Sequence, residues 1–231
     1  MRCVNVHAAA FRTQFTNVFL TLEEGRAALS ALRAAGTLAF DQVPLVEIDG
    51  LALVQGTATA NYLGRRFGLL PTDPVLAHTV ERLWVSSQDA RAPLVSLPFA
   101  SYPSPVSATD FERVRKELDG PKGLLGRYAP KWEAALGGGD GAGPYFLGRT
   151  PSIADLGVFE VLDYFCDVYG AAEYEAALAP YARLRALVHA VRSLGRLAEH
   201  CDVERTRYDT WDGEKHANWP KYAKAVRTTL A

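Results

Sequence analysis

The run FDQVPLVEIDGLALVQGTATANYL, residues 40–63, decides the fold, since it encodes two short strands, the turns around them and the start of a helix. Residues 45–48 and 51–54 are rich in apolar and β-branched side chains, which predicts a strand in each. Asp49-Gly50 between them is typical of a two-residue hairpin turn. Pro44 cannot donate to a strand ladder, so it either turns the chain, with a cis peptide bond, or simply begins the first strand.

Helices are predicted on both sides of this hairpin. Residues 22–35 predict a helix that ends at Gly36, and residues 57–67 predict one that ends at Gly68. Glycine is favoured at both ends because it readily adopts the left-handed conformation that closes a helix. The remaining elements predicted for this part of the chain are a helix at residues 1–14 and a strand at residues 18–20. Together they predict a small α/β domain.

Residues 69–75 form the clearest linker in the chain, because Pro71 and Pro74 disfavour regular structure there. The sequence beyond the linker is helical in pattern. We expect helices at residues 75–98, 110–136, 152–168, 180–192 and 194–201, and a short amphipathic segment at 222–230. The predicted organisation is therefore an α/β domain at residues 1–68, a linker at 69–75 and an all-α domain at 76–231.

The composition excludes several classes of protein. The chain has 231 residues, enough for two small domains, and its 25 basic and 26 acidic side chains show no basic excess for binding nucleic acid. No apolar run approaches the roughly 20 residues that span a membrane. The three cysteines are widely spaced, and the five histidines show no metal-ligand spacing. We therefore expect a cytoplasmic protein with no metal, no other cofactor, and no membrane or nucleic-acid partner.

Three features near the hairpin favour binding of an extended peptide with carboxylate groups. A cis bond before Pro44 would turn the backbone N–H and C=O of Val43 outward, where a peptide could pair with them. Gln55-Gly56 opens a helix, whose first N–H groups and dipole favour an anion. Arg33 could bind a second carboxylate. Each feature also has an ordinary interpretation: a strand-initiating proline, a capped helix and a solvated arginine.

Residues 40–63 resemble the glutathione-binding half of the cytosolic glutathione transferases, most closely the tyrosine-type alpha and sigma classes. The resemblance implies a thioredoxin-like N-terminal domain with a cis proline, joined to an all-α domain. It implies that Val43 pairs with the cysteinyl part of glutathione, that Gln55 and Gly56 bind the γ-glutamyl carboxylate, and that Arg33 lies near the glycyl carboxylate. The glutathione-binding positions implied in this domain are Arg33, Gln42, Val43, Pro44, Gln55 and Gly56.

Gly56 departs from the family pattern, which usually has Ser or Thr at this position. The backbone N–H is retained, but the hydroxyl is lost, and a hydrogen bond of this kind contributes about 0.5–1.5 kcal/mol. Thr57 could substitute after a small shift. The departure predicts weaker binding of glutathione.

The helical half carries further parts of the resemblance. Asp89 stands where the family has an Asp that reaches across a dimer interface to the glutathione amino group, and Arg127 matches an arginine that alpha-type enzymes contribute to the partner's site. Phe40 resembles the aromatic residue that inserts into the partner subunit. Ser152 and Asp155 match the family's helix-capping signature, which is structural. The resemblance therefore implies a homodimer.

The group that activates the sulfur is not identified. Tyrosine-type transferases have a Tyr at the end of their first strand, whereas the resemblance in this chain begins inside the first helix. We therefore expect an incomplete thioredoxin-like domain, with the first strand and the Tyr upstream of Met1. Either the sequence starts late or the protein lacks this strand. Cys3 is a conceivable substitute nucleophile, but an ordinary helix cysteine is the simpler interpretation.

The first hypothesis for function is a glutathione transferase that conjugates the thiolate of glutathione to small hydrophobic electrophiles. The alternative is a non-catalytic protein of the same fold that binds glutathione or another ligand, or acts as a scaffold. Conjugation, peroxide reduction and isomerisation all use the same thiolate, so the sequence does not choose among them. The physiological thiol could also be a glutathione derivative, such as a polyamine adduct.

Overall fold

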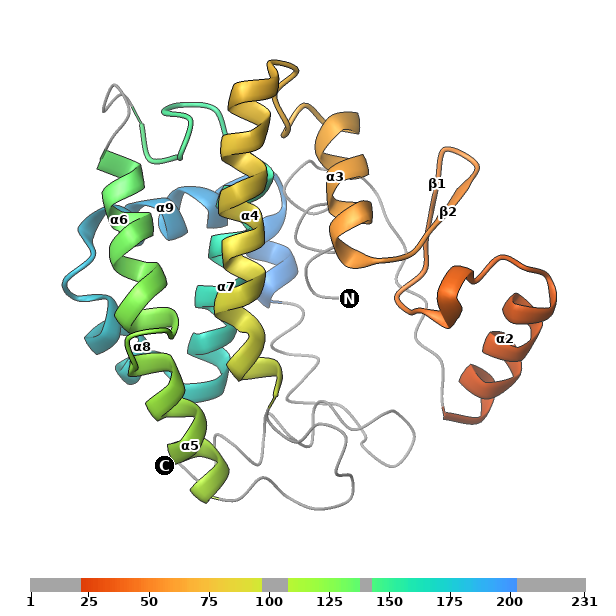
Figure 1. Cartoon of the computed structure of the whole chain (residues 1–231), viewed down its shortest axis with the longest axis horizontal. Coiled ribbons are helices and arrows are strands. Elements are labelled where there is room, and N and C mark those ends of the chain that lie inside the picture. The colour runs from red at the N-terminus through yellow and green to blue at the C-terminus, as the bar shows by residue number, and fades with distance from the viewer. Residues whose placement is uncertain (1–21, 97–107, 138–142, 203–231) are drawn as a thin grey trace.

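The computed structural model describes residues 22–96, 108–137 and 143–202, and shows a helical body beside a smaller part that carries the hairpin (Figure 1). The smaller part contains α2 (Leu22–Ala34), a 3₁₀ turn η1 (Ala39–Asp41), β1 (Val46–Ile48), β2 (Leu51–Leu53) and α3 (Gly56–Arg66). The helix predicted at residues 1–14 and the strand at 18–20 lie outside the described residues.

The predicted hairpin is confirmed. β1 and β2 are antiparallel, with Val46 opposite Leu53 and Ile48 opposite Leu51. Asp49 and Gly50 both have positive φ, 53° and 74°, as a hairpin turn of the mirror-image type requires. Within the described residues these two strands form the whole sheet.

The helical body contains α4 (Pro74–Val95), α5 (Ala108–Asp119), a π-helical turn η2 (Leu124–Tyr128), α6 (Ala129–Gly137), α7 (Ile153–Tyr169), α8 (Ala171–Leu178) and α9 (Ala182–Arg192). The start of α4 is determined locally. Asp73 accepts hydrogen bonds from the N–H groups of Val75, at 3.0 Å, and Leu76, at 2.9 Å. Pro74 suits the first helical position, where no intrahelical N–H bond is needed.

Two predictions for this part were wrong. The helix expected over residues 110–136 is interrupted between α5 and α6, because Pro121 cannot continue a helix. Gly126 lies so close to the carbonyl of Gly120 that a Cβ would be 2.3 Å from its oxygen. The second error is α8, which was not predicted at all.

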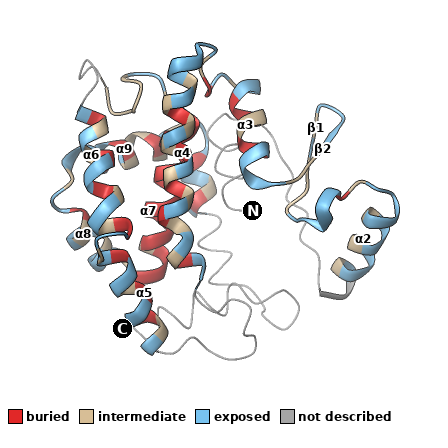
Figure 2. Cartoon of the chain, viewed as in Figure 1, coloured by how far each residue is buried: buried red, intermediate tan, exposed pale blue. Residues whose placement is uncertain are grey.

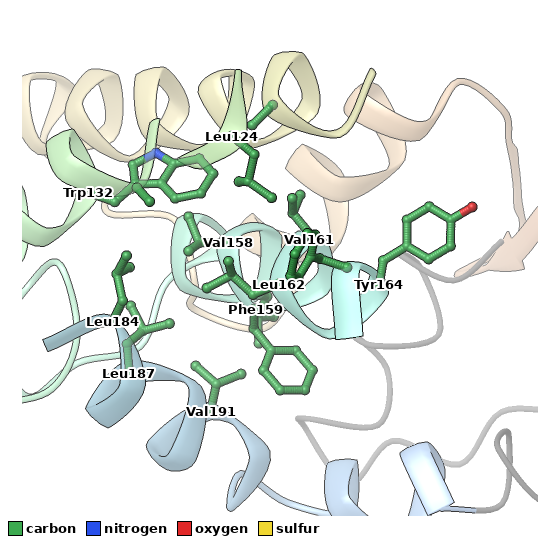
Figure 3. Close-up of a cluster of buried hydrophobic side chains, with 14 of the residues drawn as sticks. Leu124, Trp132, Val158, Phe159, Val161, Leu162, Tyr164, Leu184, Leu187 and Val191 are labelled. Atoms are coloured by element: carbon green, nitrogen blue, oxygen red, sulfur yellow. The ribbon is translucent and has the colours of Figure 1, made fainter. Parts of the chain in front are cut away.

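The core is centred on α7 (Figures 2 and 3). Every residue of α7 except Cys166 is buried, and the helix packs against α4, α8 and α9. In Figure 3, Phe159 lies on the side of α9, near Val191, while Trp132 of α6 covers Val158. α7 begins with the predicted capping box: the Ser152 N–H donates to Asp155 Oδ2 at 2.7 Å, and the Ser152 side chain accepts from the backbone one turn on.

The two parts meet where α3 packs on the start of α7. Gly64 of α3 lies against Ile153, since a Cβ on Gly64 would be 2.7 Å from Ile153 Cγ2. The Ile153 N–H also donates to the carbonyl of Leu69 at 3.1 Å. This junction orients α3, and with it the hairpin, on the helical body. Across the described ranges, none of the helices has both the length and the apolar character that crossing a membrane requires.

Candidate functional site

The turn that precedes the hairpin forms one edge of the candidate site. The Val43–Pro44 peptide bond is cis, so the turn interpretation of Pro44 is confirmed. Val43 is 58% exposed and Gln42 is also exposed. The backbone N–H and C=O of Val43 have no hydrogen-bonding partner among the described residues. This edge can therefore pair with an extended peptide.

The start of α3 forms a second edge. Gln55 occupies the N-cap position with φ 69° and ψ 107°, and its side chain makes no capping hydrogen bond. A non-glycine residue with such a backbone is strained by about 1–3 kcal/mol, and residues of this kind concentrate at functional sites. The first N–H groups of a helix have no intrahelical partner, so they can bind an anion.

Gly56, the departure from the family pattern, has open space around it. A Cβ at this position would meet nothing within 4 Å. The absence of a side chain is therefore not required by packing. Nothing in the structure explains why glycine stands here.

Contacts between the hairpin and α3 hold these two edges in place. Asp49 in the hairpin turn accepts hydrogen bonds from Tyr62, at 2.8 Å, and Arg66, at 3.0 Å. The hydrogen bond from Tyr62, followed by that from Arg66, lowers the pKa of the Asp49 carboxyl below its ordinary value. The same contact raises the pKa of Tyr62. Asp49 is therefore charged at neutral pH and ties the hairpin to the helix whose first turn is part of the site.

Arg33 is the predicted cation of the site, and it is paired. Its Nε donates to Asp41 Oδ1 at 2.7 Å. Asp41 directly precedes Gln42, so the contact brings the C-terminal end of α2 beside the cis-proline turn. Sequence reasoning did not assign a role to Asp41. An i,i+8 contact across a turn has no local sequence signal, although Asp41 stands within the run that decides the fold.

Phe40, the predicted dimer contact, is 79% exposed on the η1 turn. Its backbone is left-handed, with φ 57° and ψ 18°. An aromatic side chain held outward in this way is available to a partner, and the dimer contact stays a prediction.

The two site residues predicted in the helical body lie on different elements. Asp89 is exposed on α4, and Arg127 is exposed on η2, where its guanidinium lies 5.3 Å from the ring centroid of Tyr128. Within the described ranges, no hydrogen bond or ion pair joins either residue to the hairpin part of the same chain. Their role in the site of a partner subunit stays a prediction.

Sequence reasoning also missed a buried ion pair between α4 and α7. Glu160 is 1% exposed, and Arg91 Nε lies 3.5 Å from its Oε1. Arg91 also lies over the ring of Tyr164, 5.9 Å from its centroid. The described residues contain no cluster of three or more His, Cys, Asp or Glu side chains that could hold a metal ion.

Comparison with known proteins shows that the chain is similar to glutathione S-transferases. Residues 105–203 match the family model "Glutathione S-transferase, C-terminal domain". Glutathione S-transferase 3 of Gallus gallus is 32% identical over 154 residues, which are 67% of this chain and 62% of that protein. The aligned part thus spans less than two thirds of the chicken relative.

Two further relatives cover more of the chain. Glutathione S-transferase alpha M14 of Sus scrofa is 27% identical over 217 residues, 93% of this chain and 89% of that protein. The crystal structure of the glutathione S-transferase from Ascaris lumbricoides superimposes with a TM-score of 0.64 at 25% identity, covering 88% of this chain and 90% of the other. The expected architecture, a thioredoxin-like part joined to an all-helical part, is confirmed by this likeness.

Proposed function

Since the chain is related in sequence and in fold to the alpha-class glutathione S-transferases, we propose that it binds glutathione at the Val43–Pro44 turn and the start of α3. The observation that carries the proposal is the exposed Val43 backbone at a cis proline. An extended tripeptide pairs with that backbone as an added strand. The γ-glutamyl carboxylate then meets the first N–H groups of α3, beside Gln55 and Gly56.

The binding site includes residues from two subunits of a homodimer. Asp89 and Arg127 reach the glutathione of the partner, and Phe40 is the contact that inserts into the partner's helical part. Their exposure on one chain supports this role, because a residue that serves a partner's site does not need a contact within its own chain. The proposed glutathione-binding residues are Arg33, Gln42, Val43, Pro44, Gln55, Gly56, Asp89 and Arg127.

The proposed reaction is conjugation to a small hydrophobic electrophile. The glutathione thiol loses its proton, the thiolate sulfur forms a bond to an electrophilic carbon, and the leaving group departs with its electron pair. Binding at a site that favours the thiolate makes the nucleophile available at neutral pH, and positioning it beside the electrophile supplies the rest of the acceleration. Glutathione is a co-substrate, and the proposal includes no resident cofactor. The group that activates the sulfur is not assigned.

The proposed domain division is residues 1–68 for glutathione, a linker at 69–75 and residues 76–231 for the electrophile. The end of α3 at Arg66 and the start of α4 at Pro74 support a boundary in this region. A protein that acts on glutathione in this way belongs in the cytoplasm, where the tripeptide is abundant and thiols stay reduced.

Calorimetry with glutathione tests the binding site. The change Gln55→Glu keeps the shape of the side chain but adds a negative charge where the γ-glutamyl carboxylate binds, so we expect the affinity to fall about tenfold or more. Lys116→Gln on α5 is the matched control, since it changes the net charge by the same amount away from the site, and we expect it to leave the affinity unchanged. Equal affinity of the wild type and Gln55→Glu would reject the site.

Turnover separates an enzyme from a binding protein. With a chlorodinitrobenzene-type electrophile and saturating glutathione, an enzyme releases chloride and forms the conjugate faster than the uncatalysed reaction does. Binding of glutathione without turnover of this or other hydrophobic electrophiles would instead support a non-catalytic protein of the same fold.

A further inference from the structure

Arg33 is the cation at the glycyl end of the proposed site, and Asp41 of the same chain balances its charge. Arg33 Nε lies 2.7 Å from Asp41 Oδ1, a distance typical of a short charge-assisted hydrogen bond. The side chains of both residues remain about half exposed or more, at 48% and 65%. A ligand can therefore reach the pair, but it meets a net charge of zero rather than a free guanidinium.

The backbone holds Asp41 at this position. The turn after α2 contains Gly36, which has φ 68° and whose N–H donates to the carbonyl of Arg33 at 3.0 Å. Leu38 is the buried anchor of the following turn, and the Asp41 N–H donates to its carbonyl at 3.3 Å. Asp41 itself is left-handed, with φ 54°, a conformation that Asp tolerates better than most residues. The carboxylate thus faces Arg33 because of the path of the turn.

The helix end adds to the effect of Asp41. Arg33 lies in the last turn of α2, at the end of the helix dipole that carries partial negative charge. A carboxylate that approaches Arg33 is therefore opposed by Asp41 and by the end of the helix dipole. An uncharged carbonyl group is opposed by neither, and it can accept a hydrogen bond from the remaining N–H groups of the guanidinium, which has five.

We propose that Asp41 makes this site selective for a glutathione-like thiol whose glycyl end is blocked, as an amide or an ester, over glutathione with a free glycyl carboxylate. Asp41 is the specificity residue, and Arg33, whose positive charge Asp41 balances, is a hydrogen-bond donor to an uncharged carbonyl group rather than a carboxylate receptor. The inference rests on the proposed function, because it concerns the same site. It narrows the thiol substrate to a class in which the glycyl carboxylate has been condensed with an amine or an alcohol.

The test is calorimetry with two probes, glutathione and glutathione ethyl ester, which is blocked at the glycyl carboxylate. We expect the wild type to bind the ester about threefold to tenfold more tightly than glutathione. Asp41→Asn frees Arg33 and removes the opposing charge, so its affinity for glutathione should rise about fivefold while its affinity for the ester stays the same. High ionic strength should reduce the preference of the wild type, because the pair is exposed and its charges are screened.

Glu81→Gln is the matched control. It removes one negative charge from an exposed ion pair between α3 and α4, in which Arg65 Nη2 and Glu81 Oε1 are 3.7 Å apart. The net charge changes as it does in Asp41→Asn, so a gain in affinity for glutathione that is specific to Asp41 must be absent here. Arg33→Ala should weaken the binding of both probes, and that of glutathione more than that of the ester, because it leaves the Asp41 carboxylate without its cation.

The possible failures are distinguishable. Tighter binding of glutathione than of its ester by the wild type would overturn the inference while leaving the proposed function intact, because it would mean that Arg33 leaves Asp41 to bind the carboxylate. Equal glutathione affinity in the wild type and Asp41→Asn would overturn it as well. Binding of neither probe by any of these variants would overturn both the inference and the proposed function.

Discussion

The hairpin part and the helical body of this protein differ in how far their side chains are buried. In the helical body, α7 is buried along almost its whole length among α4, α8 and α9. Before residue 59, by contrast, Leu38 is the one buried apolar side chain among the residues whose burial is described. Unusual backbone conformations show the opposite distribution, since they are concentrated in the hairpin part. Within the described ranges, the non-glycine residues with positive φ are Phe40, Asp41, Asp49 and Gln55.

The difference indicates that the residues that pack in the core and the residues of the proposed binding site lie in different parts of the chain. The free energy of folding comes mainly from the helical body, where apolar area is buried. The hairpin part instead carries exposed charges, a cis proline and strained backbone, which are the features of a binding edge. Substitutions in the helical body should therefore change stability, whereas substitutions at the hairpin should change binding.

The largest effect on stability is expected from Trp132→Ala in the helical body. Trp132 is fully buried, and its Nε1 donates to Ser86 Oγ at 2.9 Å. Removing an aromatic side chain from a core costs about 3–5 kcal/mol of unfolding free energy. Urea unfolding followed by circular dichroism measures the loss. The control Trp132→Phe keeps most of the packing and loses only the hydrogen bond, so it should cost much less. A loss below about 1 kcal/mol for Trp132→Ala would contradict the expectation that the free energy of folding comes mainly from the helical body.

An intermediate, pH-dependent effect is expected at Asp155. Burial raises its pKa from 3.8 to about 6, against the hydrogen bonds from Ser152 and Phe146. The folded state therefore holds this proton more tightly than the unfolded chain does. The resulting stabilisation is fully present below about pH 4 and is lost as the pH rises through about 6, a change of about 1–3 kcal/mol.

The variant Asp155→Asn isolates this contribution, because it removes the titrating group and keeps the shape. The stability of the wild type relative to Asp155→Asn should fall between about pH 4 and about pH 7, as measured by unfolding at each pH. Ser152→Ala is the control, since it retains the carboxyl and so should retain the pH dependence. A difference between wild type and Asp155→Asn that is constant across this range would contradict the prediction.

The smallest effect on stability is expected from Gln42→Ala at the binding edge. Gln42 is exposed with an ordinary extended backbone, φ −93° and ψ 139°, so the unfolding free energy should change by less than about 0.5 kcal/mol. The affinity for glutathione should fall about threefold to tenfold, as for the loss of a hydrogen bond. His78→Ala, at an exposed position of α4, should change neither quantity. A stability loss at Gln42 as large as that at Trp132 would show that packing and recognition are not separate.

What the sequence predicted well were features that a few adjacent residues determine. Asp49-Gly50 specifies its turn because both residues accept positive φ, and Ser152 with Asp155 specifies a capping box three residues apart. Gly36 and Gly68, which follow α2 and α3 with positive φ, act in the same local way. The resemblance carried by residues 40–63 extended these local signals to the whole fold.

What only the tertiary structure decided were contacts between residues that are distant along the chain. The break between α5 and α6, by contrast, follows from Pro121, a local signal that the helical pattern of residues 110–136 concealed. Arg91 meets Glu160 because α4 and α7 cross there. Arg33 meets Asp41 because a turn of particular backbone angles returns the chain to the end of α2. The sequence by itself therefore determined where the proposed binding residues stand along the chain, and the tertiary structure decided that Arg33 is paired with Asp41, since electrostatic contact depends on distance in space.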